Sequence, residues 1–288
     1  MNKPKFFRTL RNVSRKGYIA LAAGIIIMCV FAVFAIFPES VAPYNPETVF
    51  EPYQPCSSEH LLGTNNLGRD ILSETIYAAR STLAVGLLAA LISLVVGTVI
   101  GLLAGYLGSI AGEAVNGIIN FFLLIPMLPL AIVLAAYLGA GWQNVVLTIS
   151  LLGWCSTARA VRARTMQLKK MPFTEIMRGL GYSKARILFG HIMPNLREVV
   201  VAKYITSVAS CILLESTLGF LGLGNVTDIT WGGMINLAYK HGGFAMGAYN
   251  WFIAPGVCIM LLVLAFYMIN YFLEKRADAV KGGSGYLD

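Results

Sequence analysis

The chain has 288 residues, of which 57% are hydrophobic and only 12% are charged. Its mean hydropathy is +0.70, and because soluble proteins carry about 25% charged residues, this composition excludes a soluble globule and predicts a membrane protein. The net charge of +8 lies at the edges of apolar segments with no interleaved aromatic residues, which argues against nucleic-acid binding.

The chain begins with a basic segment, residues 1–17, followed by an apolar run over residues 18–37. A signal peptide has an apolar core of only about 7 to 15 residues and then a small-residue cleavage site. This run is longer and continues to Pro38. We therefore expect a retained membrane span, because about 20 apolar residues cross the hydrocarbon core.

The segment after the first predicted span is rich in turn-forming residues. Residues 62–70 read LGTNNLGRD, and their glycines and asparagines tolerate unusual backbone angles, as in an ordinary surface loop. A functional motif is the alternative interpretation. Its candidate residues are Gly63, Thr64, Gly68, Arg69 and Asp70.

Two long apolar runs follow. The first predicts a span over residues 81–107, in which Gly97, Gly101 and Gly105 recur every four residues and leave a bare helix face for close packing. The second run has twice the length of one span. It predicts spans over residues 114–138 and 143–160, joined by a tight polar turn at Gly139, Gly141 and Asn144.

Two prolines, Pro126 and Pro129, interrupt the third predicted span. Each removes a backbone hydrogen bond, so we expect a kink there. The kink could shape a gate in a transport pathway, and helix packing explains it equally well.

Residues 174–195, TEIMRGLGYSKARILFGHIMPN, form a polar, basic stretch between apolar segments. The first predicted helix runs from Glu175 to Leu180 and stops at Gly181. The second is capped by Ser183, runs to Met193 and ends before Pro194. An ordinary basic cytoplasmic loop is one interpretation of this stretch. A folded element that a soluble partner pushes on is the other.

The fifth predicted span, residues 199–218, carries Glu215 near its outer end. We expect this carboxylate to face a pathway or to hydrogen-bond the following glycine-rich turn, the alternative being a solvated interfacial residue. The next residues are too glycine-rich for a helix and too apolar for an ordinary loop, which predicts a position at the outer membrane surface. Candidate pathway or gate residues are Pro126, Glu215, Phe220, Gly222, Gly224 and Trp231.

The last predicted span covers residues 251–273 and is followed by a tail, residues 274–288. Cytoplasmic loops of membrane proteins carry an excess of Lys and Arg, so the distribution of these residues predicts the orientation of all six spans. Six Lys and Arg residues precede residue 17 and nine lie between 159 and 198, whereas residues 38–79 and 219–250 contain only Arg69 and Lys240. We therefore expect both termini in the cytoplasm of a prokaryote, with Cys56 outside.

The sequence offers no constellation of catalytic residues. The three histidines and five cysteines are widely spaced, so they predict neither a metal site nor a disulfide framework. A secondary transporter would need ionisable groups deep within its spans, and only Glu215 is close. The sequence also contains no Gly-Lys dipeptide, so it has no Walker A loop, and energy for transport must come from another chain.

Three motifs together resemble one family. The order Glu175, Gly181, Ile187, His191, Pro194, Asn195 resembles the EAA loop of ATP-binding-cassette importer permeases of the oligopeptide, dipeptide and nickel family. Residues 62–70 resemble the family's G-T-D-x-x-G-R-D stretch, with Asn65 in place of Asp. Residues 215–224, ESTLGFLGLG, and the pair Trp231-Gly232 resemble E-A-S-L-S-F-L-G-L-G and W-G, with Gly219 in place of Ser.

The resemblance implies an all-α transmembrane fold of the type I importer class. It implies a second, related permease, two ATPase subunits that bind ATP and Mg, and an extracytoplasmic solute-binding protein as partners, with no cofactor in this chain. In the family the EAA segment couples to a cleft of the ATPase, so Tyr182, Arg186 and Ile187 are expected to face that cleft. The implied solute is a di- or oligopeptide, with nickel or a metal chelate as the alternative.

Overall fold

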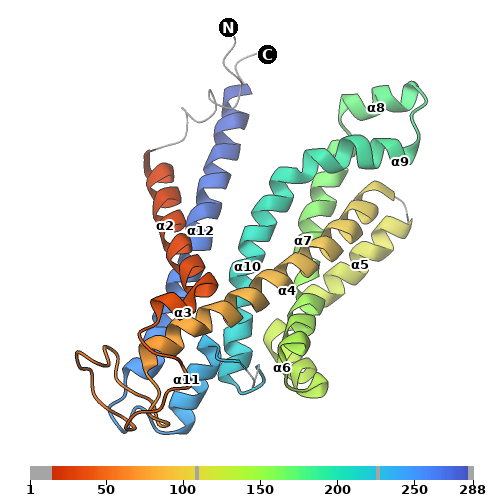
Figure 1. The fold of residues 1–288 in the computed structure, drawn as a ribbon. Helices are drawn as coiled ribbons and strands as arrows, with labels where there is room; N and C mark the ends of the chain where they lie inside the picture. The colour runs from red at the N-terminus through yellow and green to blue at the C-terminus, as the bar shows by residue number, and fades with distance from the viewer. Residues whose placement is uncertain (1–14, 108–109, 225–227, 285–288) are drawn as a thin grey trace. The chain divides into compact units, whose positions relative to one another are not determined.

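The computed structural model describes residues 15–107, 110–224 and 228–284. This part of the chain is helical apart from loops and one isolated antiparallel bridge between Thr64 and Asp70. It divides into two compact units, which we call the terminal unit (residues 1–84 and 219–288) and the central unit (residues 85–218). The long helices α4 (Ile71–Leu107) and α10 (Arg197–Phe220) contribute to both (Figure 1).

Among the described residues, five helices are long and apolar enough to cross a membrane, or six if one bent pair counts as a single span. The five are Arg15–Ile36, Ile71–Leu107, Trp142–Lys169, Lys184–Phe220 and Asn250–Arg276. Each predicted span falls on one of these helices or on the bent pair, and most helices extend beyond it. The positions of the spans in the bilayer stay a prediction.

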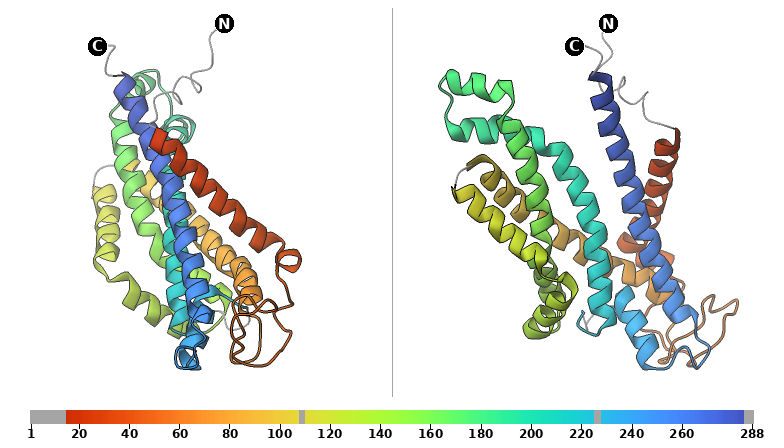
Figure 2. Two further views of the ribbon diagram at one scale, coloured as in Figure 1. Left: turned by 90° about the vertical axis from the view of Figure 1, so that its left-hand side faces the viewer. Right: turned by 180° about the vertical axis from the view of Figure 1, so that it is seen from behind.

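In the terminal unit, α2 (Arg15–Ile36) packs along α12 (Asn250–Ser284), as Figures 1 and 2 show. The helices approach closely at Gly24, where an added Cβ would lie 2.9 Å from the carbonyl oxygen of Ala265. The rings of Tyr18 and Phe272 pack with centroids 5.4 Å apart. Without a hydrophobic driving force between helices in lipid, such close packing is what holds them together.

Arg80 in α4 ties the end of α2 to the short helix α3 (Pro38–Val41). Its guanidinium donates to the carbonyl oxygen of Ala35 at 2.9 Å and to Glu39 Oε1 at 2.9 Å. A backbone hydrogen bond at Glu39 and the bond from Arg80 hold the pKa of this exposed carboxyl below its usual range. The chain is therefore fixed where it leaves α2.

In the central unit, the glycine face of α4 lies against α7 (Trp142–Lys169). A Cβ added at Gly97 or Gly101 would lie 2.5 Å from the carbonyl oxygens of Trp154 and Ala158, respectively. Only glycine permits this approach. The predicted close-packing face is thus confirmed, and α7 is the helix that occupies it.

The third predicted span is broken rather than kinked. Helices α5 (Ile110–Leu124) and α6 (Met127–Leu138) meet at Pro126 with a bend of 87° between residues 112–124 and 127–138. The expected interruption at Pro126 is therefore present, and residues 114–138 as a single span stay a prediction, since the bent pair can be counted as one broken span. The predicted polar turn follows α6, where Asn144 Nδ2 donates to the carbonyl oxygen of Leu138 at 2.7 Å.

Candidate functional site

The first candidate site is the segment between α7 and α10. Its first helix, α8 (Pro172–Gly179), starts earlier than the predicted Glu175 because Pro172 fits the first helical turn. Glu175 is exposed in that turn, where a carboxylate is favoured by the helix dipole, while the N-cap residue Met171 makes no side-chain bond. The predicted stop at Gly181 is confirmed by its φ of +80°.

The stop is a Schellman motif. The amide of Tyr182 donates to the carbonyl of Met177 at 3.1 Å, and the amide of Gly181 donates to that of Arg178 at 3.0 Å. This pair of bonds requires a left-handed residue at Gly181, which a side chain would resist. Ser183 then caps the next helix by accepting from the amide of Arg186 at 3.3 Å, as predicted.

The second predicted helix does not end before Pro194. Helix α9 (Lys184–Ile187) continues through a π-helical turn (Leu188–Ile192) and a 3-10 turn (Met193–Leu196) into α10. Pro194 is accommodated at the start of the 3-10 turn, where its missing amide costs little. Asn195 Nδ2 donates to the carbonyl oxygen of His191 at 2.7 Å and so satisfies an acceptor at this irregular point.

The expected outward position of Ile187 is wrong in this structure. Ile187 is only 1% exposed and packs in a core with Leu188, Ile192 and Leu196 against α4 and α7. Tyr182 and Arg186 do lie at the surface, with the Arg186 guanidinium 4.8 Å from the Tyr182 ring centroid. The Tyr182 ring also contacts His191 edge-on, with ring centroids 6.2 Å apart.

Sequence reasoning missed two exposed apolar residues on this segment. Ile176 is 62% exposed and Leu180 is 69% exposed, both on α8 or at its cap. The two residues are four positions apart, so their side chains are available together for contact with a partner protein. The sequence did not separate them from Phe173 and Met177 of the same segment, which pack against the core.

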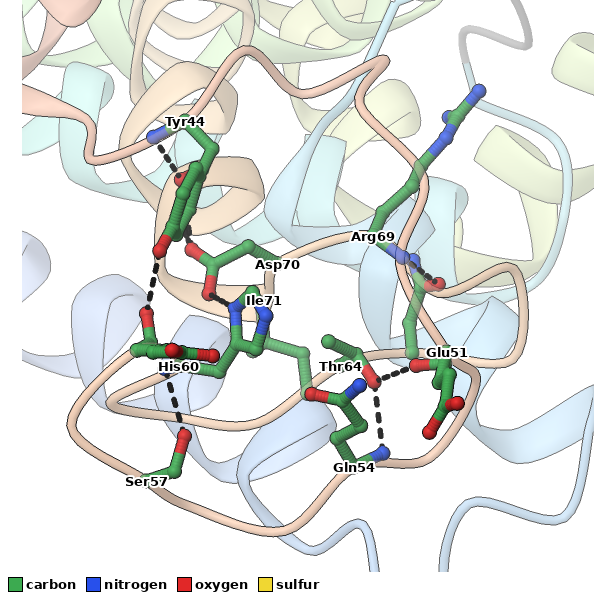
Figure 3. A network of polar contacts seen from close by, with 12 residues as sticks. Tyr44, Glu51, Gln54, Ser57, His60, Thr64, Arg69, Asp70 and Ile71 are labelled. Carbon is green, nitrogen blue, oxygen red and sulfur yellow. Dashed lines mark hydrogen bonds and ion pairs between the residues drawn. The ribbon is translucent and has the colours of Figure 1, made fainter.

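The second candidate site is the loop before α4, which Figure 3 shows as a polar network. Asp70 is buried. Its Oδ1 lies 3.0 Å from His60 Nδ1, and its Oδ2 accepts from the Ser73 amide and hydroxyl. Thr64 donates to the carbonyl of Glu51 at 2.7 Å and accepts from the amide of Gln54 at 2.8 Å. These two motif residues therefore hold the loop together.

The motif glycines allow the loop to fold on itself. Gly63 and Gly68 both have positive φ, and a Cβ at Gly68 would overlap the carbonyl of Phe50. The role of His60 was not foreseen, because its ring packs between Tyr44 and Phe50, which only the folded loop brings together.

Asn65, where the family has Asp, binds both the loop and α4. Its Oδ1 accepts from the amides of Leu67 and Arg69, and its Nδ2 donates to Glu74 Oε2 at 2.9 Å. An amide can donate and accept together, whereas an ionised carboxylate at this place could accept from the loop amides but could not donate to Glu74.

The third motif lies in the same unit as this loop. Helix α10 ends at Phe220, as the glycine-rich sequence predicted, and Asn236 of α11 (Trp231–Lys240) donates to the Phe220 carbonyl at 2.5 Å. The backbones of Gly219 and Gly232 lie close together, since a Cβ added at Gly219 would lie 3.2 Å from the Gly232 backbone. A serine in place of Gly219 would crowd this contact.

Trp231 is fully buried, with 0% exposure. Its amide donates to Thr82 Oγ1 at 3.2 Å, its Nε1 donates to the carbonyl of Thr75 at 2.9 Å, and its ring packs against Phe31. This burial favours a structural role in anchoring α11 to α4, while a role in the pathway stays a prediction.

The terminal unit contains a cavity of about 390 Å³ where the loop motif meets the glycine-rich turn. Of the predicted site residues, Arg69, Gly222 and Gly224 line it. Other lining residues are Glu74, Gly219, Asp228, Ile229, Thr230, Gly233, Met234, Asn236, Leu237 and Lys240. Two motifs that are far apart in the sequence thus form one site.

Glu215 lies in the last turns of α10 and is 1% exposed, and Ser216 Oγ donates to its Oε2 at 3.2 Å. It is therefore not a solvated side chain in this structure. Because a buried carboxylate must keep its hydrogen bonds, we expect Glu215→Gln to impair transport while expression is unchanged. Solute uptake beside the amount of protein in membranes would measure this, and wild-type uptake would show that the charge is dispensable.

The fold and these sites define an all-helical membrane protein with a basic element between two spans. A chain of the MetNI methionine ABC transporter, solved in inward-facing conformations, shares this fold with a TM-score of 0.57 and 18% identity over 73% of this chain and 97% of that chain. The similarity shows an importer permease fold.

The chain belongs to the family of binding-protein-dependent transport system inner membrane components, which matches residues 97–279. The glutathione transport system permease protein GsiD of Salmonella typhimurium is 35% identical over 274 residues, covering 93% of this chain and 89% of that protein. GsiD of Pectobacterium atrosepticum is 32% identical over 267 residues, covering 91% and 87%.

Membership of this family confirms several predictions. The chain is a permease of a binding-protein-dependent ABC importer, a multi-pass inner membrane protein that is not itself catalytic and does not bind ATP. ATPase and binding-protein partners follow from the same membership. The alternative of a secondary transporter is thereby removed.

Proposed function

We propose that this permease imports short peptides, and that the segment from α8 to the start of α10 transmits the motion of the ATPase subunits to the spans. The observation that supports the coupling role is the pair of short helices locked by the Schellman motif at Gly181. The exposed residues Ile176, Leu180 and Tyr182 give this element an apolar and aromatic surface for a partner.

In this proposal Ile187 is an anchor rather than a contact. Its burial between α4 and α7 joins the coupling element to two spans, so a push on α8 reaches them through packed side chains. A second, related permease completes the pathway, and two ATPase subunits bind ATP and Mg beneath it. Closure of the ATPase pair then switches the pathway from inward to outward facing, and the binding protein delivers the solute from outside.

The peptide substrate is supported by the relatives, which are named for glutathione, a tripeptide. Nickel or a metal chelate is the second candidate from the sequence. The described residues include no group of three or more His, Cys, Asp or Glu side chains placed to hold a metal. Uptake of a labelled dipeptide and of nickel by liposomes containing all subunits tests the proposal. Nickel uptake without peptide uptake would contradict it.

The proposed orientation places both termini in the cytoplasm and Cys56 outside. Cys56 is exposed, and its Sγ accepts a hydrogen bond from Asn250 Nδ2 at 2.9 Å. We therefore expect a membrane-impermeant maleimide to label intact cells, and the label to disappear in Cys56→Ser. Labelling of Cys56 only in inside-out vesicles would reverse the orientation.

A further inference from the structure

The cavity in the terminal unit presents two basic side chains, Arg69 and Lys240, on a wall that also holds the acids Glu74 and Asp228 beside glycines and apolar residues. Its volume of about 390 Å³ is at the small end of the range for ligand sites, roughly 300 to 1,000 Å³. The described residues that line the cavity all belong to one compact unit. A cavity of this volume suits one end of a small molecule better than a whole large solute.

Arg69 is incompletely satisfied. Its Nε is buried without a hydrogen-bond partner among the described residues, and its Nη1 is 3.9 Å from Glu74 Oε1, the far limit of an ion pair. Figure 3 shows that its side chain extends away from the loop network of His60 and Asp70. A guanidinium has five donors in a planar fork that matches a carboxylate, so this side chain retains the capacity to bind one.

Lys240 is exposed at the end of α11, and no hydrogen bond or ion pair to it is found among the described residues. A Cβ added at Gly222 would lie 3.4 Å from its Nζ, so the amine lies close to this glycine. The two acidic side chains that line the cavity already interact with other groups. Glu74 accepts from Asn65, and Asp228 has an interaction of its own. Among the charged side chains of the cavity, unfilled hydrogen-bond donors thus remain on Arg69 and Lys240.

We propose that this cavity is a carboxylate-binding subsite, in which Arg69 and Lys240 hold the free carboxylate of a short peptide on its way through the importer. The inference rests on the proposed peptide function for the identity of the solute. Unfilled hydrogen-bond donors on two cations favour an anion as the ligand.

The test uses the purified importer complex without its binding protein, and equilibrium dialysis of labelled alanyl-alanine and its C-terminal amide. The complex should bind the free acid about tenfold more tightly than the amide, as expected for charge-assisted hydrogen bonds. Arg69→Gln and Lys240→Gln should each reduce this preference. Lys275→Gln, a control on α12 where the lysine contacts the Tyr271 ring, should retain it.

Equal binding of acid and amide by the wild type, or an undiminished preference in Lys240→Gln, would overturn the proposal. If instead Lys240→Gln weakened stimulation of ATP hydrolysis by the binding protein while the wild type showed no preference, the cavity would serve docking of that protein, and the subsite would again be rejected. If the preference held but liposomes imported no peptide, the carboxylate site would stand and the proposed peptide function would fail.

Discussion

Replacing Gly181 with valine is expected to disconnect ATP hydrolysis from uptake, or to prevent binding of the ATPase, while all spans still insert. Gly181 has a φ of +80° and closes the Schellman motif at the end of α8. A left-handed conformation costs a residue with a side chain roughly 1 to 2 kcal/mol, and more if it is β-branched. The valine variant should therefore release α8 from its fixed angle to α9, and uptake should fall by about tenfold or more.

Uptake into liposomes and co-purification of the ATPase with the permease measure the effect. Gly181→Ala should be milder because alanine resists positive φ less than valine. Gly179→Ala is the matched control, since Gly179 is helical and no atom lies within 4 Å of a Cβ added there. Wild-type uptake and ATPase binding in Gly181→Val would support an ordinary loop and refute the coupling role.

A valine at Gly101 should destabilise the central unit. A Cβ there would lie 2.5 Å from the carbonyl oxygen of Ala158 and 2.9 Å from Val161 Cβ, and both belong to α7. The helices must then separate. Overpacking of this kind lowers the free energy of unfolding by about 1 to 3 kcal/mol or more. We expect a lower unfolding temperature in detergent and less protein in membranes.

Gly117→Val separates this steric effect from the intrinsic cost of valine in a helix. Gly117 is also helical, and no atom lies within 4 Å of a Cβ added there. Thermal unfolding followed by size-exclusion chromatography compares the two variants. Equal unfolding temperatures would mean that α4 and α7 do not depend on the glycine face for their packing.

Local sequence was sufficient for most of the elements, although not for the start of α8 or the helical stretch through Pro194. Length and apolarity placed the helices, the turn at Gly139 to Asn144 formed as expected, and Gly181 and Ser183 mark the stop and the start of the coupling helices. These features depend on backbone conformation and on neighbours within a few residues, so they can be read from a short window of sequence.

Tertiary structure alone decided which residues of each motif face a partner and which are buried. Ile187 packs in the core although it belongs to a basic surface segment, Pro194 stays within a continuous helical stretch, and Trp231 is fully enclosed. Arg69 lines the same cavity as the glycine-rich turn and Lys240 only because the loop before α4 and the end of α10 belong to one unit. Such contacts join residues far apart in the chain. A local pattern of charge or hydropathy does not show which distant segment will lie beside it.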